Sequence, residues 1–391
     1  MKPLAAWFSP RLRFCLLAFI TGRLVLSALA VVGWHVPQAE PEPATHWNPE
    51  RPSNAWLNAF AGFEHFDAQW YLQIARDGYV EGDPSAAYFP LYPLLTRLVG
   101  VVLDERWLLA GTLVSNAALL AALVLLHRLT SAVLSEEAAR WAVVLLLVNP
   151  MAFFLYAPYS ESLFLLLALA CLAWLREGRW VHAAGAAALA TATRSTGVVL
   201  RLAMAAKALH DAGWWPRRPD AWRLFLGRAG LTALGAGGLL AYLGLWALKG
   251  DWDAPLRSQR TDFYREVSWP WVSVRDGVRD AVVTWNEPGS LIMNTVVLLT
   301  VITLLLTPVA LRRYGVAHGA YLLGSVVVPL CLVRPYAPLT SMPSYYLVAF
   351  PALWALVELT RRPAWRVVTV TVSGALLALL TLLFTSWHDV L

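Results

Sequence analysis

Long apolar runs follow one another along the chain, and short polar segments separate them. A helix needs about 20 apolar residues to cross the hydrocarbon core of a bilayer. The runs predict eleven spans, at 14–34, 108–127, 140–157, 162–175, two within 180–210, 224–248, 291–311, 315–333, 344–358 and 365–386. Most of the short turns between them carry Arg or Lys, as the positive-inside rule expects of cytoplasmic turns. The pattern therefore predicts an all-α protein that crosses the membrane many times.

Two long polar segments, 35–107 and 249–290, interrupt this pattern. With a basic cytoplasmic start, both fall on the outer side of the membrane, within a single domain, 1–391. The first apolar run is longer than the core of a signal peptide, so a retained first span is favoured over a cleaved one. A break near Arg194–Gly197 divides 180–210 into two short spans; a single span there would invert everything downstream. Asn149-Pro150 predicts a kink within its span.

Composition narrows the class of protein. Hydrophobic residues make up 58% of the 391 residues, only 14% are charged, and the mean hydropathy is +0.55. Soluble domains carry about 25% charged residues. The formal charge of +6 is explained by cytoplasmic turns, so no nucleic-acid partner is expected. Cys15, Cys171 and Cys331 lie in apolar runs and form neither a disulfide framework nor a zinc spacing.

One segment of the first outer loop carries an acid in an unusual place. On a helical wheel an apolar stripe is formed by Phe63, Phe66, Trp70, Tyr71 and Ile74, with Gln69, Gln73 and Arg76 opposite. Asp67 lies inside the apolar stripe, where a carboxylate is costly to desolvate unless it is paired or used. The pattern predicts an interfacial helix that holds one acid at the membrane surface. The alternative is a helix N-cap, a position that Asp favours.

The residues around Asp67 also resemble a known family. FDAQWYLQIARDGY, followed by YFPLYPLL, is similar to the first outer loop of the PIG-V-like mannosyltransferases, in the GT-C glycosyltransferase superfamily. PYSESLF at 158–164, ATRSTG at 192–197 and SMPSYYLVAFP at 341–351 fit the same pattern in order. The resemblance implies a GT-C-like helical bundle with interfacial helices in its large first outer loop. It implies transfer of a hexose, mannose in this family, from a polyprenyl-phosphate carrier to a lipid or glycan hydroxyl.

Two positions depart from the family. Its members usually show Trp-Asp where this chain has Phe66-Asp67, and typically carry Arg at the position of Ser344. The resemblance makes Asp67 the general base, because an acceptor hydroxyl is a poor nucleophile until a carboxylate takes its proton. Displacement in one step would invert the anomeric centre.

Two arginines are candidates for holding the donor phosphate. Arg194 interrupts an apolar segment, where a cation is expensive, and the matching family segment also has an Arg. Arg334 follows a span and could replace the arginine missing at Ser344. A guanidinium binds phosphate oxygens in a bidentate manner. The structural alternative for Arg194 is that its side chain reaches the outer interface.

Candidate substrate-binding residues share a polar or aromatic tip on the predicted outer side. They are His65, Gln69, Trp70, Tyr71, Tyr88, Tyr92, Glu161 and Tyr345. Each has a structural alternative. His65 is favoured as a polar interfacial residue over half of a metal pair, Trp70 is equally an interfacial anchor, and the segment from Tyr88 to Pro93 is primarily a proline-fixed turn. Glu161 could orient the acceptor or pair with Arg194, but a solvated loop acid that caps span four is slightly favoured.

In the second outer loop, Gln259, Arg260 and Trp285 match the family weakly. For Arg257, Arg260 and Arg265 a face toward anionic lipid headgroups is ranked first.

No metal site is predicted, although a divalent metal is left open. The chain lacks a Gly-rich phosphate loop and an Asp-x-Asp motif, which argues against a nucleotide-sugar donor. We therefore expect an enzyme of a bacterial plasma membrane with an outer active site; the rival is a transporter or flippase of lipid-linked sugars.

Overall fold

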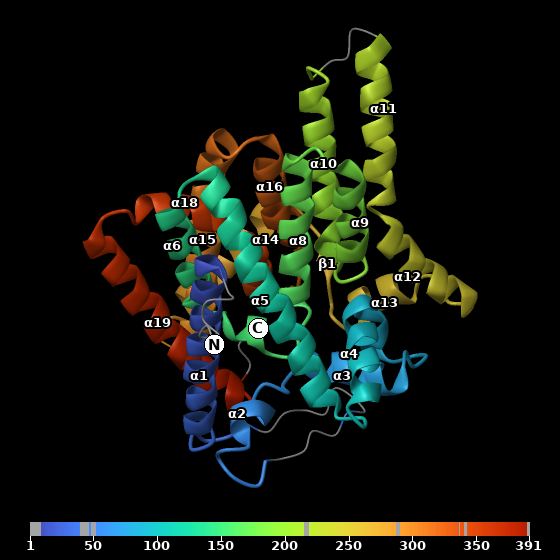
Figure 1. Cartoon of the computed structure of the whole chain (residues 1–391). Coiled ribbons are helices and arrows are strands. Elements are labelled where there is room, and N and C mark those ends of the chain that lie inside the picture. Colours follow the sequence, from blue (N-terminus) through green and yellow to red (C-terminus); the bar gives the residue numbers. More distant parts are fainter. Residues whose placement is uncertain are drawn as a thin grey trace, which may run out of the picture. The chain divides into compact units, whose positions relative to one another are not determined.

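The computed structural model describes residues 9–39, 47, 52–214, 219–286, 290–335, 337–339 and 342–388. Residues 40–46, 48–51 and 287–289 of the two predicted outer segments therefore lie outside the described residues. The described chain is mostly helical (Figure 1). It forms two compact units, the first with Met1–Gly78, Tyr92–Leu166 and Leu356–Val390, and the second with Tyr79–Leu91 and Leu167–Ala355. The single-domain assignment of 1–391 remains a prediction.

The first unit contains both ends of the described chain. Its helices are α1 (Pro10–Gly33), α2 (Asn58–Ala61), α3 (Asp67–Asp77), α4 (Leu91–Val102), α5 (Trp107–Val133), α6 (Glu136–Leu147), α7 (Phe153–Tyr156), the start of α8 (Glu161–Arg176), the end of α18 (Pro351–Leu359) and α19 (Pro363–Thr385). The long apolar helix α1 packs against α5, α6 and α19 (Figure 1). The short α2 also packs on α1, and this contact holds the chain in place shortly before α3 begins.

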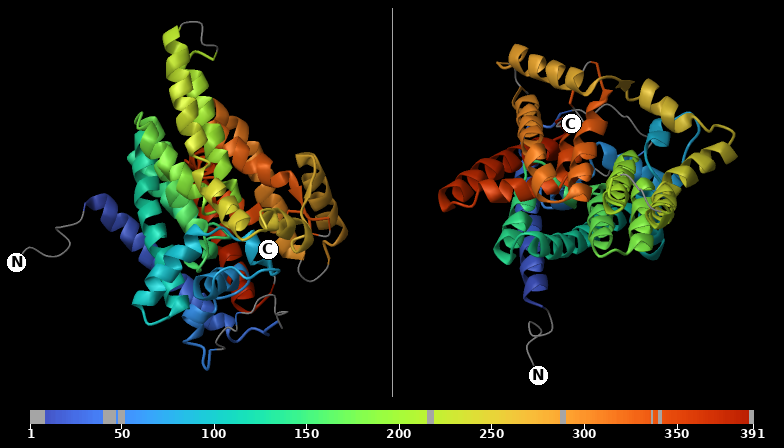
Figure 2. Two further views of the ribbon diagram at one scale, coloured as in Figure 1. Left: turned by 90° about the vertical axis from the view of Figure 1, so that its right-hand side faces the viewer. Right: turned by 90° about the horizontal axis from the view of Figure 1, so that it is seen from above.

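The second unit is built around paired helices. Its elements are η2 (Pro84–Ala87), the rest of α8, α9 (Trp180–Thr191), η3 (Ser195–Gly197), α10 (Val198–Asp211), α11 (Pro219–Leu234), α12 (Gly237–Leu248), α13 (Ala254–Thr261), β1 (Glu266–Val267), α14 (Pro270–Val283), α15 (Ser290–Arg313), α16 (Val316–Leu330), β2 (Leu332–Val333), α17 (Met342–Val348) and the start of α18. Helix α10 packs against α16 and α11, and the pair α10 and α11 is seen in Figure 2. Strands β1 and β2 pair antiparallel, with Glu266 opposite Val333.

The helices confirm a multi-pass membrane protein. Among the described residues, four helices are long and apolar enough to cross a bilayer: α1, α5, Ile292–Arg313 of α15, and α19. The number rises to six if two bent pairs each count as one span, α11 with α12 (44°) and α17 with α18 (77°). The predicted eleven spans remain a prediction.

The predicted interruptions are confirmed at two places. Helix α6 ends at Leu147 and α7 begins at Phe153, which brackets Asn149-Pro150. Helix α9 ends at Thr191 and α10 begins at Val198, which brackets the predicted break within 180–210. The spans predicted at 224–248 and 344–358 coincide with the two bent pairs, α11 with α12 and α17 with α18.

Candidate functional site

Asp67 is the first residue of α3, and Phe66 occupies the N-cap position. The N-cap interpretation of Asp67 is therefore wrong. Phe66 has φ 54° and ψ −122°, a left-handed conformation that bulky residues rarely adopt. The Asp67 carboxylate is half-buried, and it belongs to the first turn of α3, where the helix dipole favours negative charge.

Tyr159, in the turn between α7 and α8, links Asp67 to Glu161. Its hydroxyl donates a hydrogen bond of 2.9 Å to the backbone carbonyl of His65. Burial and the negative charges of Asp67 and Glu161 raise the pKa of Tyr159 well above its ordinary value. The phenol therefore stays protonated and neutral between the two acids. Sequence reasoning missed Tyr159, although it lies in the PYSESLF motif.

His65 is buried, so the expected polar interfacial role is wrong. Its Nδ1 lies 2.8 Å from the backbone carbonyl oxygen of Phe384. Because a carbonyl oxygen only accepts, Nδ1 carries the proton of the neutral ring. The ring stacks on Trp387, with centroids 3.7 Å apart and planes 22° apart. Burial lowers the pKa of His65 to about 4, so the imidazole is uncharged at neutral pH.

Helix α3 is buried more completely than an interfacial helix with one polar face. Gln69 and Gln73 are buried, and Trp70 is buried rather than exposed as an anchor. The Tyr71 hydroxyl is hydrogen-bonded to Ser160 Oγ at 2.8 Å. The Tyr71 ring packs edge-on against Tyr92 at 5.0 Å. The two contacts of Tyr71 hold α3 in place within the first unit.

Tyr92 has a mainly structural role in this arrangement. Its hydroxyl donates a 2.9 Å hydrogen bond to the carbonyl of Gly111 and contacts Ser115 Oγ at 2.8 Å. The side chain is fully buried. Tyr92 therefore ties α4 to α5; the predicted turn from Tyr88 to Pro93 is wrong at its end, because α4 already begins at Leu91.

Glu161 is the first residue of α8, and only 3% of it is exposed. The prediction of a solvated loop acid is therefore wrong. Its predicted pairing with Arg194 remains a prediction.

Glu64 is a second buried acid, which sequence reasoning did not single out; it accepts a hydrogen bond from Trp47 Nε1. Within the described ranges, no group of three or more His, Cys, Asp or Glu side chains could hold a metal. We call Asp67, Tyr159 and Glu161, with the adjoining His65 and Tyr71, the acidic site.

In the second unit, Arg194 stands at the break between α9 and α10. Its backbone is extended and precedes η3. Gly197 permits this turn, because a Cβ there would lie 2.5 Å from the backbone nitrogen of Thr191. Arg194 Nη2 donates a 3.0 Å hydrogen bond to Ser344 Oγ, and the guanidinium lies 5.2 Å from the centre of the Tyr345 ring. The residue that departs from the family, Ser344, thus accepts a hydrogen bond from the predicted phosphate ligand.

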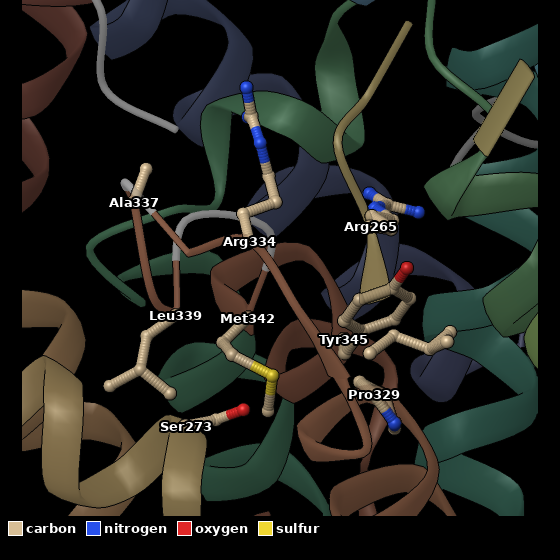
Figure 3. A pocket seen from close by; sticks show the side chains of 9 residues that line it. Arg265, Ser273, Pro329, Arg334, Ala337, Leu339, Met342 and Tyr345 are labelled. Carbon is tan, nitrogen blue, oxygen red and sulfur yellow. The ribbon is translucent and has the colours of Figure 1, made fainter. Parts of the chain in front are cut away.

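The other predicted phosphate ligand, Arg334, lines a small open recess with a cavity volume of about 20 Å³. The lining residues are Arg265, Ser273, Pro329, Leu332, Arg334, Ala337, Leu339, Met342 and Tyr345. In the register of β1 and β2, Arg265 and Arg334 are the next pair beyond Glu266 and Val333. Figure 3 shows the two arginines at one side of the recess, with Leu339 and Met342 at the other. We call this recess the basic pocket.

The lipid-facing interpretation of Arg257, Arg260 and Arg265 in the second outer loop remains a prediction. Arg265 lines the basic pocket and donates a 2.8 Å hydrogen bond to Gln259 Oε1. Arg257 forms ion pairs with Asp251 and Asp253. Arg260 is exposed, and Trp285 is 67% exposed. The cross-strand position of Arg265 was not visible in the sequence, because β1 and β2 have only two residues each.

Tyr88 belongs to the second unit and lies among aromatic residues. Its carbonyl accepts a 2.7 Å hydrogen bond from the Tyr79 hydroxyl, and its ring lies 5.9 Å from that of Phe263. The structure thus groups the predicted residues into three sets: the acidic site with Gln69, Trp70 and Tyr92; Arg194 and Arg334 around Tyr345; and Tyr88 beside α13. Their roles toward substrate remain predictions. Of the SMPSYYLVAFP motif, Ser341 lies outside the described residues.

Comparison with known proteins identifies the family. The family model described as "Mannosyltransferase (PIG-V)" matches residues 15–212. GPI alpha-1,6-mannosyltransferase 2 of Homo sapiens is 37% identical over 149 residues, which are 35% of this chain and 30% of the human protein. GPI mannosyltransferase 2 of Drosophila melanogaster is 26% identical over 202 residues, which are 47% of this chain and 45% of the fly protein. The matches thus span less than half the length of either relative.

A solved structure shares the fold. The crystal structure of ArnT from Cupriavidus metallidurans, bound to undecaprenyl phosphate, matches 92% of this chain and 63% of that chain, with a TM-score of 0.55 and 12% identity. The fold is therefore that of the GT-C membrane glycosyltransferases. Since the family model matches more than half of the residues, the chain belongs to the PIG-V mannosyltransferase family.

Proposed function

We propose that this protein is a membrane glycosyltransferase that moves a hexose, mannose, from a polyprenyl-phosphate carrier to a hydroxyl of a lipid or glycan acceptor. Transfer inverts the anomeric centre and takes place at the outer face of a bacterial plasma membrane. Family membership and the GT-C fold support glycosyl transfer over transport. The observation that carries the proposal is the position of Asp67, half-buried at the start of α3 beside Tyr159.

The proposed transfer requires one general base. As the acceptor oxygen bonds to C1 of the sugar, the Asp67 carboxylate takes the hydroxyl proton. The bond between C1 and the phosphate oxygen breaks, and the bonding electron pair leaves with the phosphate. Because the phosphate leaves as an anion, no second acid has to protonate it. Tyr159 is kept neutral by burial and by the acids beside it, and its O–H is donated to the His65 carbonyl, so it does not compete for that proton.

The basic pocket is suited to the phosphate and the lipid chain of the donor. Its cations, Arg334 and Arg265, match a phosphate, and its apolar side, with Leu339 and Met342, matches the chain attached to that phosphate. Arg194 is braced by Ser344 and by the face of Tyr345, and Tyr345 also lines the pocket. A guanidinium held in one orientation loses less side-chain entropy when it binds phosphate.

The test is transfer from a labelled polyprenyl-phosphate mannose in detergent. We expect Asp67→Asn to lower kcat by a factor on the order of a hundred or more, while donor binding is kept. Asp77→Asn is the matched control on the same helix, because Asp77 is paired with Arg76 and its side chain is 38% exposed. Normal transfer by Asp67→Asn would reassign the base, with Glu161 as the next candidate. Failure of the wild type to use any lipid-phosphate sugar would refute the proposed function.

A further inference from the structure

The end of α19 lies against the residues that precede Asp67. His65 and Phe384 are 319 residues apart in the chain, yet His65 Nδ1 donates a 2.8 Å hydrogen bond to the Phe384 carbonyl. The Phe66 ring lies 5.5 Å from the Phe384 ring and 6.0 Å from the Trp387 ring. The His65 ring is stacked on Trp387 at 3.7 Å. Both residues before Asp67 therefore contact the same short segment.

Two of these residues have strained backbones. Phe66 has φ 54° and Trp387 has φ 66°, in the left-handed region that favours glycine. Such conformations cost free energy and persist only where the surrounding contacts hold them. Here each strained residue packs against the other, and the stacked His65 joins them.

His65 is held from two directions. Its ring is fixed by the Phe384 carbonyl and the Trp387 face, and its own carbonyl accepts the Tyr159 hydroxyl at 2.9 Å. The turn at Phe66 is the next residue, and Asp67 follows it directly. The direction of the Asp67 carboxylate therefore depends on how firmly this turn is held. A misplacement of about 1 Å in a reacting group can cost about a hundredfold in rate.

We propose that Trp387 is a positioning residue for Asp67, which it orients through the stacked His65 and the strained turn at Phe66. The proposal rests on the proposed function of Asp67 as the base. Trp387 does not contact the substrate; it prevents the turn from relaxing to an unstrained conformation that would redirect the carboxylate.

A membrane-interface anchor is the competing explanation for a Trp at a helix end. Trp365, at the other end of α19, fits that description, since it is 56% exposed. Trp387 is half-buried and stacks on the buried imidazole of His65, a contact that anchoring at the interface does not require. The two tryptophans of one helix thus give a matched pair for experiment.

The experiment compares Trp387→Ala, Trp387→Phe and Trp365→Ala in the full-length protein in detergent. Hydrogen exchange of peptides covering residues 64–72 reports the turn directly, without any assay of transfer. We expect Trp387→Ala to speed exchange there about tenfold or more and to lower kcat about tenfold or more, with the donor KM within twofold of wild type. Trp387→Phe keeps a stacking ring and should restore kcat to within about threefold. Trp365→Ala should change neither quantity.

Unchanged exchange in Trp387→Ala would overturn the proposal, and so would faster exchange with an unchanged kcat. A rise in the donor KM at constant kcat would also overturn it, because a positioning role for the base acts on the chemical step. If Trp387→Ala does not purify as a monodisperse protein, Trp387→Leu takes its place, because it keeps bulk without a stacking ring: unchanged exchange and kcat in Trp387→Leu would overturn the proposal. If the wild type transfers no sugar, the proposed function fails, while exchange still reports whether Trp387 holds the turn.

Discussion

The acidic site of the first unit and the basic pocket of the second differ in how their polar groups are used. In the acidic site the tyrosine hydroxyls are engaged within the protein, as in the contacts of Tyr71 with Ser160 and of Tyr159 with His65. In the basic pocket two arginines border a small open recess, with a cavity volume of about 20 Å³. One region is closed by packing, whereas the other places two guanidinium side chains beside an open recess.

This difference follows from what each region is proposed to do. A base works only within hydrogen-bond reach of its proton, and its strength depends on how much water surrounds it. Phosphate recognition depends on charge and on long guanidinium side chains that adapt to the ligand. We therefore expect changes of packing in the acidic site to lower kcat, and changes of charge in the basic pocket to raise the donor KM.

The two regions share one feature, a strained residue next to a functional candidate. Phe66 (φ 54°) precedes Asp67, Tyr264 (φ 49°) precedes Arg265, and Leu339 (φ 67°) lines the basic pocket. Strained backbone conformations cluster at functional sites, where the surrounding structure holds them. The shared strain indicates that the surrounding contacts hold the backbone beside Asp67 and beside Arg265.

The largest expected effect is a pH dependence of stability at the acidic site. The pKa of His65 is lowered to about 4 from 6.5 because the ring is buried. The unfolded chain therefore binds a proton more readily than the folded one between these values. Stability should be complete above about pH 6.5 and fall as the pH drops toward 4, by a total of about 3 kcal/mol.

The measurement is the apparent Tm in detergent from pH 7 to pH 4.5. His65→Asn cannot ionise, so its Tm should fall less steeply with pH than that of wild type. His182→Asn, at an exposed position of α9, is the control and should follow wild type. Parallel curves for wild type and His65→Asn would show that His65 is not enclosed, and the contrast between the two regions would weaken.

The second effect concerns charge in the basic pocket. Arg334→Ala and Arg265→Ala should each raise the donor KM about tenfold, because each removes charge-assisted hydrogen bonds to the phosphate. Steady-state kinetics at fixed acceptor concentration and fixed salt give the values. Arg257→Ala is the matched control from the same segment, since Arg257 is paired with Asp251 and Asp253. A fall in kcat at constant KM for either pocket variant would contradict the assignment of donor binding to the basic pocket and of the chemical step to the acidic site.

Local signals in the sequence were enough to predict a mostly helical membrane protein and two interruptions of its helices. Asn149-Pro150 and the cation Arg194 in an apolar run act within a few residues, and the breaks were found there. The bend between α11 and α12 was not predicted, because it depends on a tertiary contact. A Cβ on Gly238 of α12 would lie 2.1 Å from the carbonyl oxygen of Ala188 in α9, so α12 and α9 approach each other closely after the bend.

The candidate sites were predictable only where a motif marks them. Asp67 stood out as an acid in an apolar stripe within a family motif, and the structure places it at the start of α3. Trp387 could not be found from the sequence, because its stacking contact with His65 joins distant parts of the chain. Arg265 was assigned to a lipid surface for the same reason, since only the pairing of β1 with β2 brings it beside Arg334.

The smallest effect is expected at Ser344, where the family typically carries an arginine. Ser344 Oγ accepts a 3.0 Å hydrogen bond from Arg194, but the Arg194 guanidinium also lies over Tyr345. Ser344→Ala removes the hydroxyl and leaves the charge and the aromatic contact, so the donor KM should rise only about threefold. Ser344→Thr keeps a hydroxyl and is the control. If Ser344→Ala instead lowers kcat while KM is constant, Arg194 acts on the chemical step, and the assignment of chemistry to the acidic site and binding to the arginines of the second unit fails.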